Sequence, residues 1–110
     1  MKTFATTVVE LRQCFEQTVE THPFECGWAD EAIVFVEPHN ADPGDVVTLR
    51  VQLSPDGIRW LDEGTVLRVT EHAMARLTHF GGFLRLAGGA TNAEGAATRT
   101  TLTVRIALKG

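Results

Sequence analysis

The sequence predicts an all-β protein, an antiparallel β-sandwich of the jelly-roll-like kind with about 7–8 strands. Two observations predict it. Apolar and polar residues alternate along 46–54 and again along 101–109, and a period of two places successive side chains on opposite faces of a sheet. Turn-forming residues separate the strand-like segments at intervals of about ten residues, as in sandwiches and small barrels. The 110 residues have room for one domain, so the sandwich is expected to span 1–110.

The first 21 residues allow two interpretations. Apolar residues fall at the spacing of an amphipathic helix at Phe4, Val8, Leu11, Phe15 and Val19. The same segment is rich in threonine and valine, whose β-branched side chains are stiff and favour strands. We predict two strands here, near 3–11 and 14–21, and keep the helix as the alternative.

The strands in the rest of the chain are clearer. Residues 31–37 are predicted to form a central strand, because 32–36 are apolar on both faces. Along the two alternating segments, the residues expected to face the dry interior are Val47, Leu49, Val51, Leu53, Leu102, Val104, Ile106 and Leu108. Shorter strands are predicted at 58–61, 66–70 and 83–87. Residues 71–80 fit either a strand or a short helix that ends at Gly81.

Glycine, proline, asparagine and aspartate mark the turns between these strands. The predicted turns are 38–45, 55–57, 62–64, 81–82 and 88–95. The oxygen-bearing side chains in them suit Asx-turns better than the closely alternating ligands of a calcium loop. The sequence contains no nucleophile elbow, phosphate-binding loop or His-Glu-x-x-His motif. We therefore expect no enzyme activity, no metal site and no cofactor.

Composition places the chain among ordinary globular domains. It is 44% hydrophobic and 22% charged, with a net charge of −4. No apolar run approaches the roughly 18 residues of a membrane span, and we find no secretory signal. We expect a cytoplasmic or particle-associated protein that binds no membrane. In such a compartment Cys14 and Cys26 are expected to be buried, reduced thiols.

The charges are unevenly distributed along the chain. Residues 1–45 carry two basic and nine acidic side chains, whereas 46–110 carry eight basic and five acidic ones. The two parts are therefore expected to attract each other, either within one fold or between neighbouring copies. The basic excess is small and has no aromatic residues interspersed, so we expect no nucleic-acid partner.

The most distinctive segment is 51–60, Val-Gln-Leu-Ser-Pro-Asp-Gly-Ile-Arg-Trp. It predicts a strand, a Pro-Asp-Gly turn and a return strand that buries the indole of Trp60. This Ser-x-Asp-Gly-x-x-Trp hairpin resembles one found in discoidin-like β-sandwiches and in small phage-tail and virion β-modules. The resemblance covers 46–110 and implies a sandwich fold. The chain lacks the length and the end-to-end cysteine bridge of discoidin domains, so the resemblance assigns no binding residue.

The candidate binding residues are aromatic side chains and their polar neighbours. They are Trp28, Asp30, Asp56, Arg59, Trp60, Phe80 and Phe83. Trp28 precedes the central strand, where we predict that its indole plugs the end of the core, with stacking on a sugar as the alternative. The sequence contains no tyrosine, which is unusual for a recognition surface.

Two functions from different classes remain. The one we prefer is a non-enzymatic structural β-sandwich that assembles into a homo-oligomer, or binds other protein subunits, as a phage-like or other particle component. The attraction between the oppositely charged parts makes this association sensitive to salt. The alternative is a carbohydrate-binding, lectin-like sandwich that uses Trp28 or Trp60 to bind a glycan.

Overall fold

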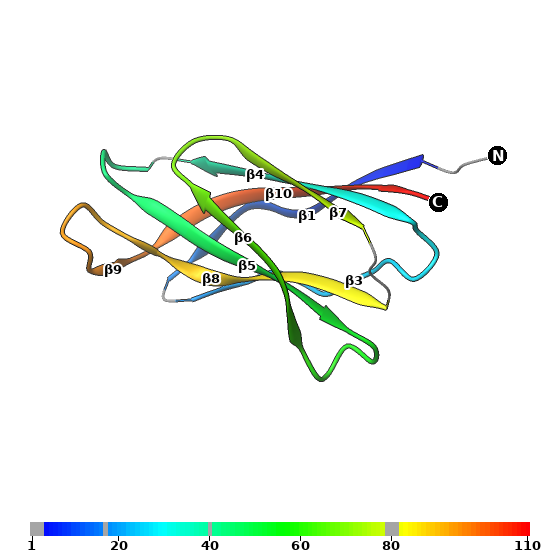
Figure 1. Cartoon of the computed structure of the whole chain (residues 1–110). Helices are drawn as coiled ribbons and strands as arrows, with labels where there is room; N and C mark the ends of the chain where they lie inside the picture. Colours follow the sequence, from blue (N-terminus) through cyan, green and yellow to red (C-terminus); the bar gives the residue numbers. More distant parts are fainter. Residues whose placement is uncertain (1–3, 17, 40, 79–81) are drawn as a thin grey trace.

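The fold is an all-β sandwich, as the sequence predicts. The computed structural model describes residues 4–16, 18–39, 41–78 and 82–110, and Figure 1 shows strands throughout this part of the chain. The strands of the described residues are β1 (Phe4–Phe15), β2 (Val19–Glu20), β3 (Phe24–Glu25), β4 (Glu31–His39), β5 (Val46–Ser54), β6 (Leu61–Val69), β7 (Ala73–Thr78), β8 (Phe83–Thr91), β9 (Ala97–Thr98) and β10 (Thr100–Lys109). None of the described residues belongs to a helix that could cross a membrane.

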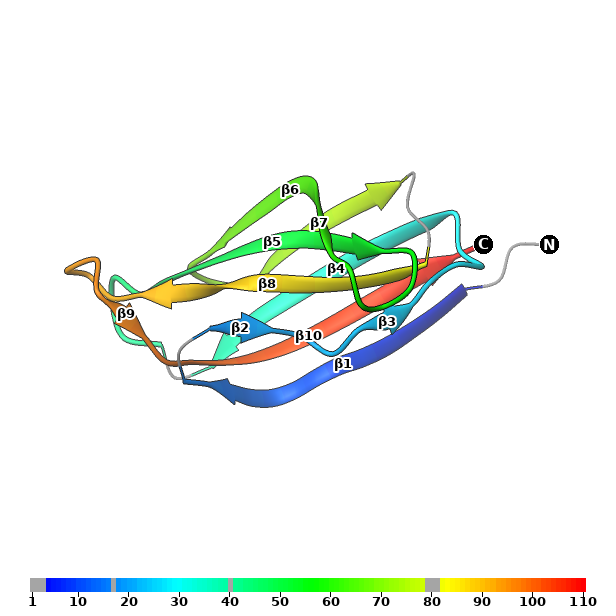
Figure 2. The same ribbon diagram turned by 90° about the horizontal axis from the view of Figure 1, so that it is seen from below.

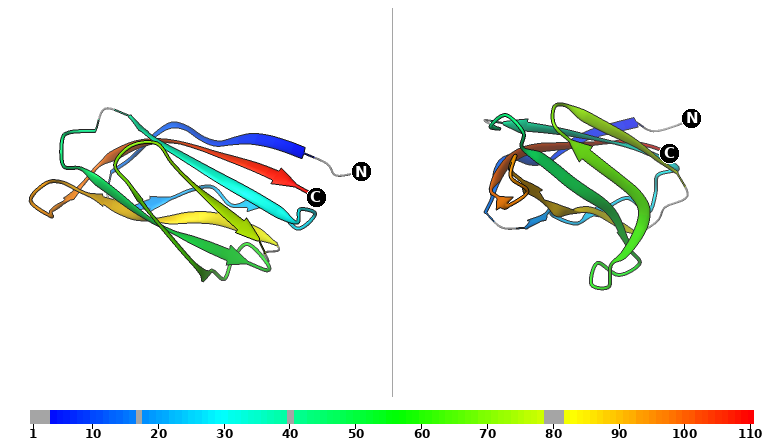
Figure 3. Two further views of the ribbon diagram at one scale, coloured as in Figure 1. Left: turned by 45° about the horizontal axis from the view of Figure 1, so that its top comes forward. Right: turned by 60° about the vertical axis from the view of Figure 1, so that its left-hand side comes forward.

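The strands form two antiparallel sheets that pack face to face. Sheet A has the order β1-β10-β4-β7, and sheet B has the order β2-β8-β5-β6, with β3 and β9 also paired to β8. Figure 2 and the left view of Figure 3 show the strands running along the length of the molecule. The start of β1 pairs with the end of β10, Phe4 opposite Lys109. We call this end of the sandwich the termini end, and the opposite end the far end.

The space between the sheets is the hydrophobic core. Leu49 and Val51 of β5 and Leu102 and Val104 of β10 are at most 1% exposed, so both alternating segments bury the predicted face. The core also takes in inward-facing side chains of the other strands, among them Val19, Val34, Val36, Leu67, Val69, Leu77, Leu84 and Leu86. The predicted central strand is confirmed as β4, which lies between β10 and β7.

The first strand differs from the prediction of two separate strands. β1 continues from Phe4 to Phe15, and the helical alternative is wrong as well. Its pairing with β10 shifts register between Val8 and Gln13, and Arg12 adopts a φ of 48°. These β-bulges allow the strand to continue through the point at which the alternation breaks. The predicted second strand is reduced to β2.

Strands extend into three predicted turns, which shortens two of them and makes the prediction of a turn at 62–64 wrong. β4 continues to His39 and β8 to Thr91, so 38–45 and 88–95 are only partly turns. Residues 62–64 lie within β6, where Gly64 has a φ of 114° beside a bulge in the pairing with β5. Conversely, the predicted strand at 58–61 is wrong, because a loop occupies 55–60 and β6 begins only at Leu61. Residues 71–80 contain the strand β7 and no helix within the described part.

The two cysteines are free but differ in exposure. Cys26 is buried as predicted, whereas Cys14 is exposed. Cys14 pairs with Thr101 on the edge strand β1, where no further strand covers it. Burial, with a smaller contribution from the neighbouring Glu25, raises the pKa of the Cys26 thiol to about 11.

This difference predicts the thiol reactivity of the protein. At about pH 8, a disulfide reagent should modify Cys14 rapidly and Cys26 only after unfolding, because the thiolate is the reactive species and Cys26 is enclosed. Counting modified thiols before and after adding denaturant measures this, and Cys14→Ser is the matched control. Rapid modification of both thiols in the native protein would contradict the placement of Cys26.

Ion pairs connect the acidic first part of the chain to the basic second part. Glu20 lies 4.0 Å from Arg85, and Glu37 lies 3.6 Å from Arg105, measured between carboxylate oxygen and guanidinium nitrogen. The predicted attraction between the two parts therefore acts within the fold. These pairs are partly exposed, so each is expected to contribute little to stability.

Candidate functional site

The 55–60 loop at the termini end is organised by Asp56. Its Oδ1 accepts hydrogen bonds from the backbone N–H groups of Arg59 (3.0 Å) and Ile58 (2.8 Å) and from the hydroxyl of Ser54 (2.9 Å). These hydrogen bonds lower the pKa of Asp56. The Ser54 hydroxyl oxygen in turn accepts a hydrogen bond from the N–H of Gly57 at 2.8 Å. Asp56 is thus the anchor of an Asx-type turn, since its carboxylate bonds to its own loop.

Phe83 supports this loop from β8. Gly57 has a φ of 80°, and a Cβ placed on it would lie 3.6 Å from the Phe83 ring. The positive φ favours glycine at this position, and the space beside the Phe83 ring is wide enough for an ordinary van der Waals contact. Arg59 donates its backbone N–H to Asp56 and is exposed.

Trp60 ends the loop and stacks on Arg85. The guanidinium carbon of Arg85 lies 4.4 Å from the centroid of the Trp60 ring, a cation–π arrangement. Trp60 is half-buried, and it belongs to the loop rather than to the predicted return strand. The indole therefore packs on the guanidinium of a neighbouring strand.

A polar network extends from this stack across sheet B. Arg85 donates from Nε to the Gln52 side-chain oxygen at 2.8 Å, and Gln52 donates from Nε2 to Asp62 at 3.0 Å. Arg50 lies 3.7 Å from Asp62, which links β5 to β6 a second time. We call Trp60, Arg85, Gln52 and Asp62 the Trp60 cluster. Its polar groups bond to one another, so the cluster ties β8, β5 and β6 together.

Trp28 and Asp30 lie on the neighbouring loop between β3 and β4. Trp28 is 45% exposed, so the prediction that it plugs the core is wrong. It lies against the chain end, where a Cβ on Gly110 would be 3.0 Å from the indole ring. Asp30 donates its backbone N–H to the Lys109 carbonyl at 2.7 Å, which fixes the loop to β10. Cys26 similarly bonds to the carbonyl of Gly82 at 2.8 Å.

The structure therefore collects most of the predicted site at the termini end. Asp56, Arg59 and Trp60 share one loop, with Phe83 packed beneath it, and Trp28 and Asp30 occupy the next loop. Phe80 lies outside the described residues. Arg85 and Gln52 were not predicted; the alternating pattern of β8 and β5 places them on an outer face but does not indicate that they bond to each other.

A second candidate surface is the solvent-facing side of sheet A. Ile33, Phe35 and Met74 point away from the core on the neighbouring strands β4 and β7, and Val8 does so on β1; Val8 and Met74 are 45% and 48% exposed. We call this the sheet A outer face, and define it by Thr6, Val8, Glu31, Ile33, Phe35, Met74, Arg76, Thr78, Arg105, Ala107 and Lys109. Ala107 is only 5% exposed between its larger neighbours, and Arg105 of β10 separates Val8 from Phe35. The face thus mixes apolar side chains with charges of both signs, a composition found in protein interaction surfaces.

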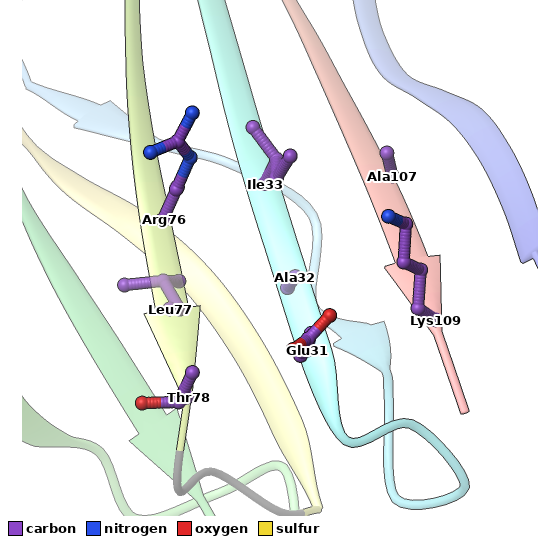
Figure 4. Close-up of a pocket in the computed structure, with 8 residues that line it drawn as sticks. All are labelled: Glu31, Ala32, Ile33, Arg76, Leu77, Thr78, Ala107 and Lys109. Carbon is purple, nitrogen blue, oxygen red and sulfur yellow. The ribbon is translucent and has the colours of Figure 1, made fainter.

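Two shallow cavities hollow this face. One has a volume of about 280 Å³. Figure 4 shows Ile33 on β4 between Arg76 on β7 and the pair Ala107 and Lys109 on β10. The other, of about 290 Å³, is lined by Phe35, His72, Ala73 and Met74. The face therefore offers depressions into which side chains of a partner can insert.

A polar cleft of about 430 Å³ lies at the far end. It is lined by residues that are distant in the sequence, among them Cys14, His39, Asp42, Asp45 and Arg99. The His39 Nε2 atom lies 2.8 Å from the Thr103 hydroxyl oxygen, so the imidazole is held by β10. The pairing of β1, β10 and β4 creates this cleft, and the sequence spacing of these residues carries no signal of it. No group of acidic, histidine and cysteine side chains in the described part of the chain is arranged to hold a metal ion.

The comparisons with known proteins identify the fold. No family model matches the chain, and no curated protein sequence does. Among solved structures, the chain is similar to the SPBc2 prophage-derived protein YomS, with a TM-score of 0.65, 9% identity and coverage of 100% of this chain and 96% of that one. It also matches the Yersinia pseudotuberculosis-derived mitogen, with a TM-score of 0.45, 9% identity and coverage of 94% and 84%. The likeness to the prophage-derived protein shows that this chain has the same β-sandwich fold.

Proposed function

We propose that this protein is a non-enzymatic structural subunit that self-associates through the sheet A outer face, as a component of a phage-type particle. The observation that carries this proposal is a set of apolar side chains, Val8 on β1 and Ile33, Phe35 and Met74 on β4 and β7, that point away from the core on the outer face of sheet A. Burying apolar area of this kind is the main driving force of subunit association.

The phage-type context is supported by the shared fold. The prophage-derived protein is similar over nearly the whole length of both chains. A fold can serve many functions, so the shared fold supports only the proposed phage-type particle. The exposed apolar side chains of the sheet A outer face support the proposed self-association.

Met74→Lys should weaken self-association. A charge placed against the apolar side chains of the other copy is desolvated without a partner charge, and a cost of about 2 kcal/mol corresponds to roughly a thirtyfold rise in the dissociation constant. Sedimentation equilibrium of the wild-type protein should give a mass that approaches twice the 12.0 kDa of the chain, and the variant should remain closer to the monomer. High salt should shift the wild type toward the monomer as well.

Ile58→Lys is the matched control. Ile58 is 80% exposed but lies in the 55–60 loop, outside the sheet A outer face, so this variant should associate like the wild type. If the wild-type protein sediments with the mass of a single chain at every concentration, in low and in high salt, the proposal is wrong.

Carbohydrate binding is the second candidate function. It is favoured by Trp28, whose exposed indole stands near Asp30 on a loop held by backbone hydrogen bonds. Sugar that stacks on this ring should change the tryptophan fluorescence, and Trp28→Ala should abolish the change while Trp60→Phe retains it. If the protein binds no sugar on a glycan array and its tryptophan fluorescence does not change when sugars are added, it is not a carbohydrate-binding protein.

A further inference from the structure

We infer that the occupant of the sheet A outer face is a second copy of this chain, related by a two-fold axis that runs parallel to the strands between β10 and β4. This inference rests on the proposed self-association and specifies its geometry. It follows from the order in which the register places outward-facing side chains on the four strands.

Three rows of side chains cross the face. In the order β1, β10, β4 and β7, the middle row is Thr6, Ala107, Ile33 and Arg76, and the next row toward the far end is Val8, Arg105, Phe35 and Met74. The row nearest the termini end contains Lys109, Glu31 and Thr78 on β10, β4 and β7. Each row thus carries different chemistry on its two halves.

The proposed axis exchanges the two halves of each row. It places β1 of one protomer over β7 of its partner, and β10 over β4. Lys109 then faces the partner's Glu31, and Val8 faces the partner's Met74. The small Ala107 faces the larger Ile33 of the partner, and Arg105 lies over the partner's Phe35. Opposite charges, two apolar side chains, and a small beside a large side chain are the combinations that stabilise an interface.

An axis perpendicular to the strands gives a poorer match. Centred on the middle row, it would place Arg76 over the partner's Arg76, and Lys109 over the partner's Arg105. Like charges that face each other in an interface are unfavourable. Charge complementarity therefore favours the parallel axis.

The available area is close to what a specific dimer needs. Three strands about 30 Å long and the six-residue β7, about 20 Å long, spaced about 4.8 Å apart, present a face of roughly 500 Å² on each copy. The pair would bury about 1,000 Å², the area that a biological interface is expected to reach. The right-handed twist of both sheets crosses their mean strand directions by about 30°, so the axis bisects this angle and follows the strands to within about 15°.

Cysteine cross-linking tests the axis. In a Cys14→Ser background, a short bis-maleimide cross-linker should join the double variant Thr6→Cys, Arg76→Cys into dimers, because these positions face each other across the axis at the spacing of packed sheets, about 10 Å, which a disulfide alone cannot bridge. Within one chain they are three strand spacings apart, about 14 Å, and a link between them there would leave the protein a monomer. The control is the double variant Thr6→Cys, Thr48→Cys. Thr48 lies on the outer face of sheet B, so dimers linked in this variant measure accidental collisions between molecules.

The outcomes separate the inference from the proposal on which it rests. A linked dimer in the first double variant, well above the level of the Thr48 control, supports the parallel axis. If Thr6→Cys alone forms linked dimers as efficiently, β1 lies over the partner's β1 and the axis is wrong, although self-association stands. If the protein is a monomer by sedimentation and neither variant exceeds the collision control, both the inference and the proposed function fail.

Discussion

Leu102→Ala is expected to lower the free energy of unfolding by about 3 kcal/mol. Leu102 is completely buried on β10, which lies between β1 and β4, and its side chain points into the core. Truncating it removes apolar contacts and leaves a cavity that two hydrogen-bonded sheets cannot close easily. Urea denaturation should show a lower midpoint with an unchanged m-value.

Leu61→Ala is the control for this prediction. Leu61 is a leucine on β6 that is 71% exposed, so its truncation should change the stability by less than about 1 kcal/mol. Equal effects of the two substitutions would contradict the assignment of Leu102 to a closed interior.

Gly88→Ala is expected to destabilise the protein by about 3 kcal/mol or more, although it adds only one methyl group. A Cβ on Gly88 would lie 1.9 Å from the Thr48 carbonyl oxygen and 3.1 Å from the Leu49 Cα. Both atoms belong to the backbone of β5, so β8 and β5 would have to separate. The thermal midpoint, measured by circular dichroism, should fall by well over ten degrees for a domain of this size.

Gly27→Ala provides the comparison for Gly88. A Cβ on Gly27 would lie 3.0 Å from the Glu25 carboxylate oxygen, whose flexible side chain can move, and 3.7 Å from the Gly82 backbone nitrogen, an ordinary van der Waals contact. A small change is expected for this variant. If Gly88→Ala were equally mild, the close approach of β8 to β5 would be wrong.

The alternating strands could be predicted from the sequence because burial on one face imposes a period of two. Leu49 and Leu102 show this, since both stand in unbroken alternation and both are fully buried. The strand ends could not be predicted in the same way. Gly88 and Asp62 are turn-forming residue types that lie within strands, where pairing with a neighbouring strand outweighs local preference.

The candidate site was predictable only where one segment contains it. Asp56 and Gly57 form a turn whose chemistry is local, so the sequence indicates it. The stacking of Trp60 on Arg85 joins a loop to a strand that is 25 positions away, and the sheet A outer face combines four strands. Strand order decides such neighbours, and the order β1-β10-β4-β7 is not encoded in any single segment.

Small-angle X-ray scattering tests face-to-face association most directly. The single chain has a radius of gyration of 13.8 Å for its Cα atoms. Two sandwiches stacked through sheet A would have centres about 20 Å apart, which gives a radius of gyration of about 17 Å at concentrations where the dimer is populated. A value that stays near that of the single chain at every concentration, or one well above 17 Å from end-to-end association, would contradict association through this face.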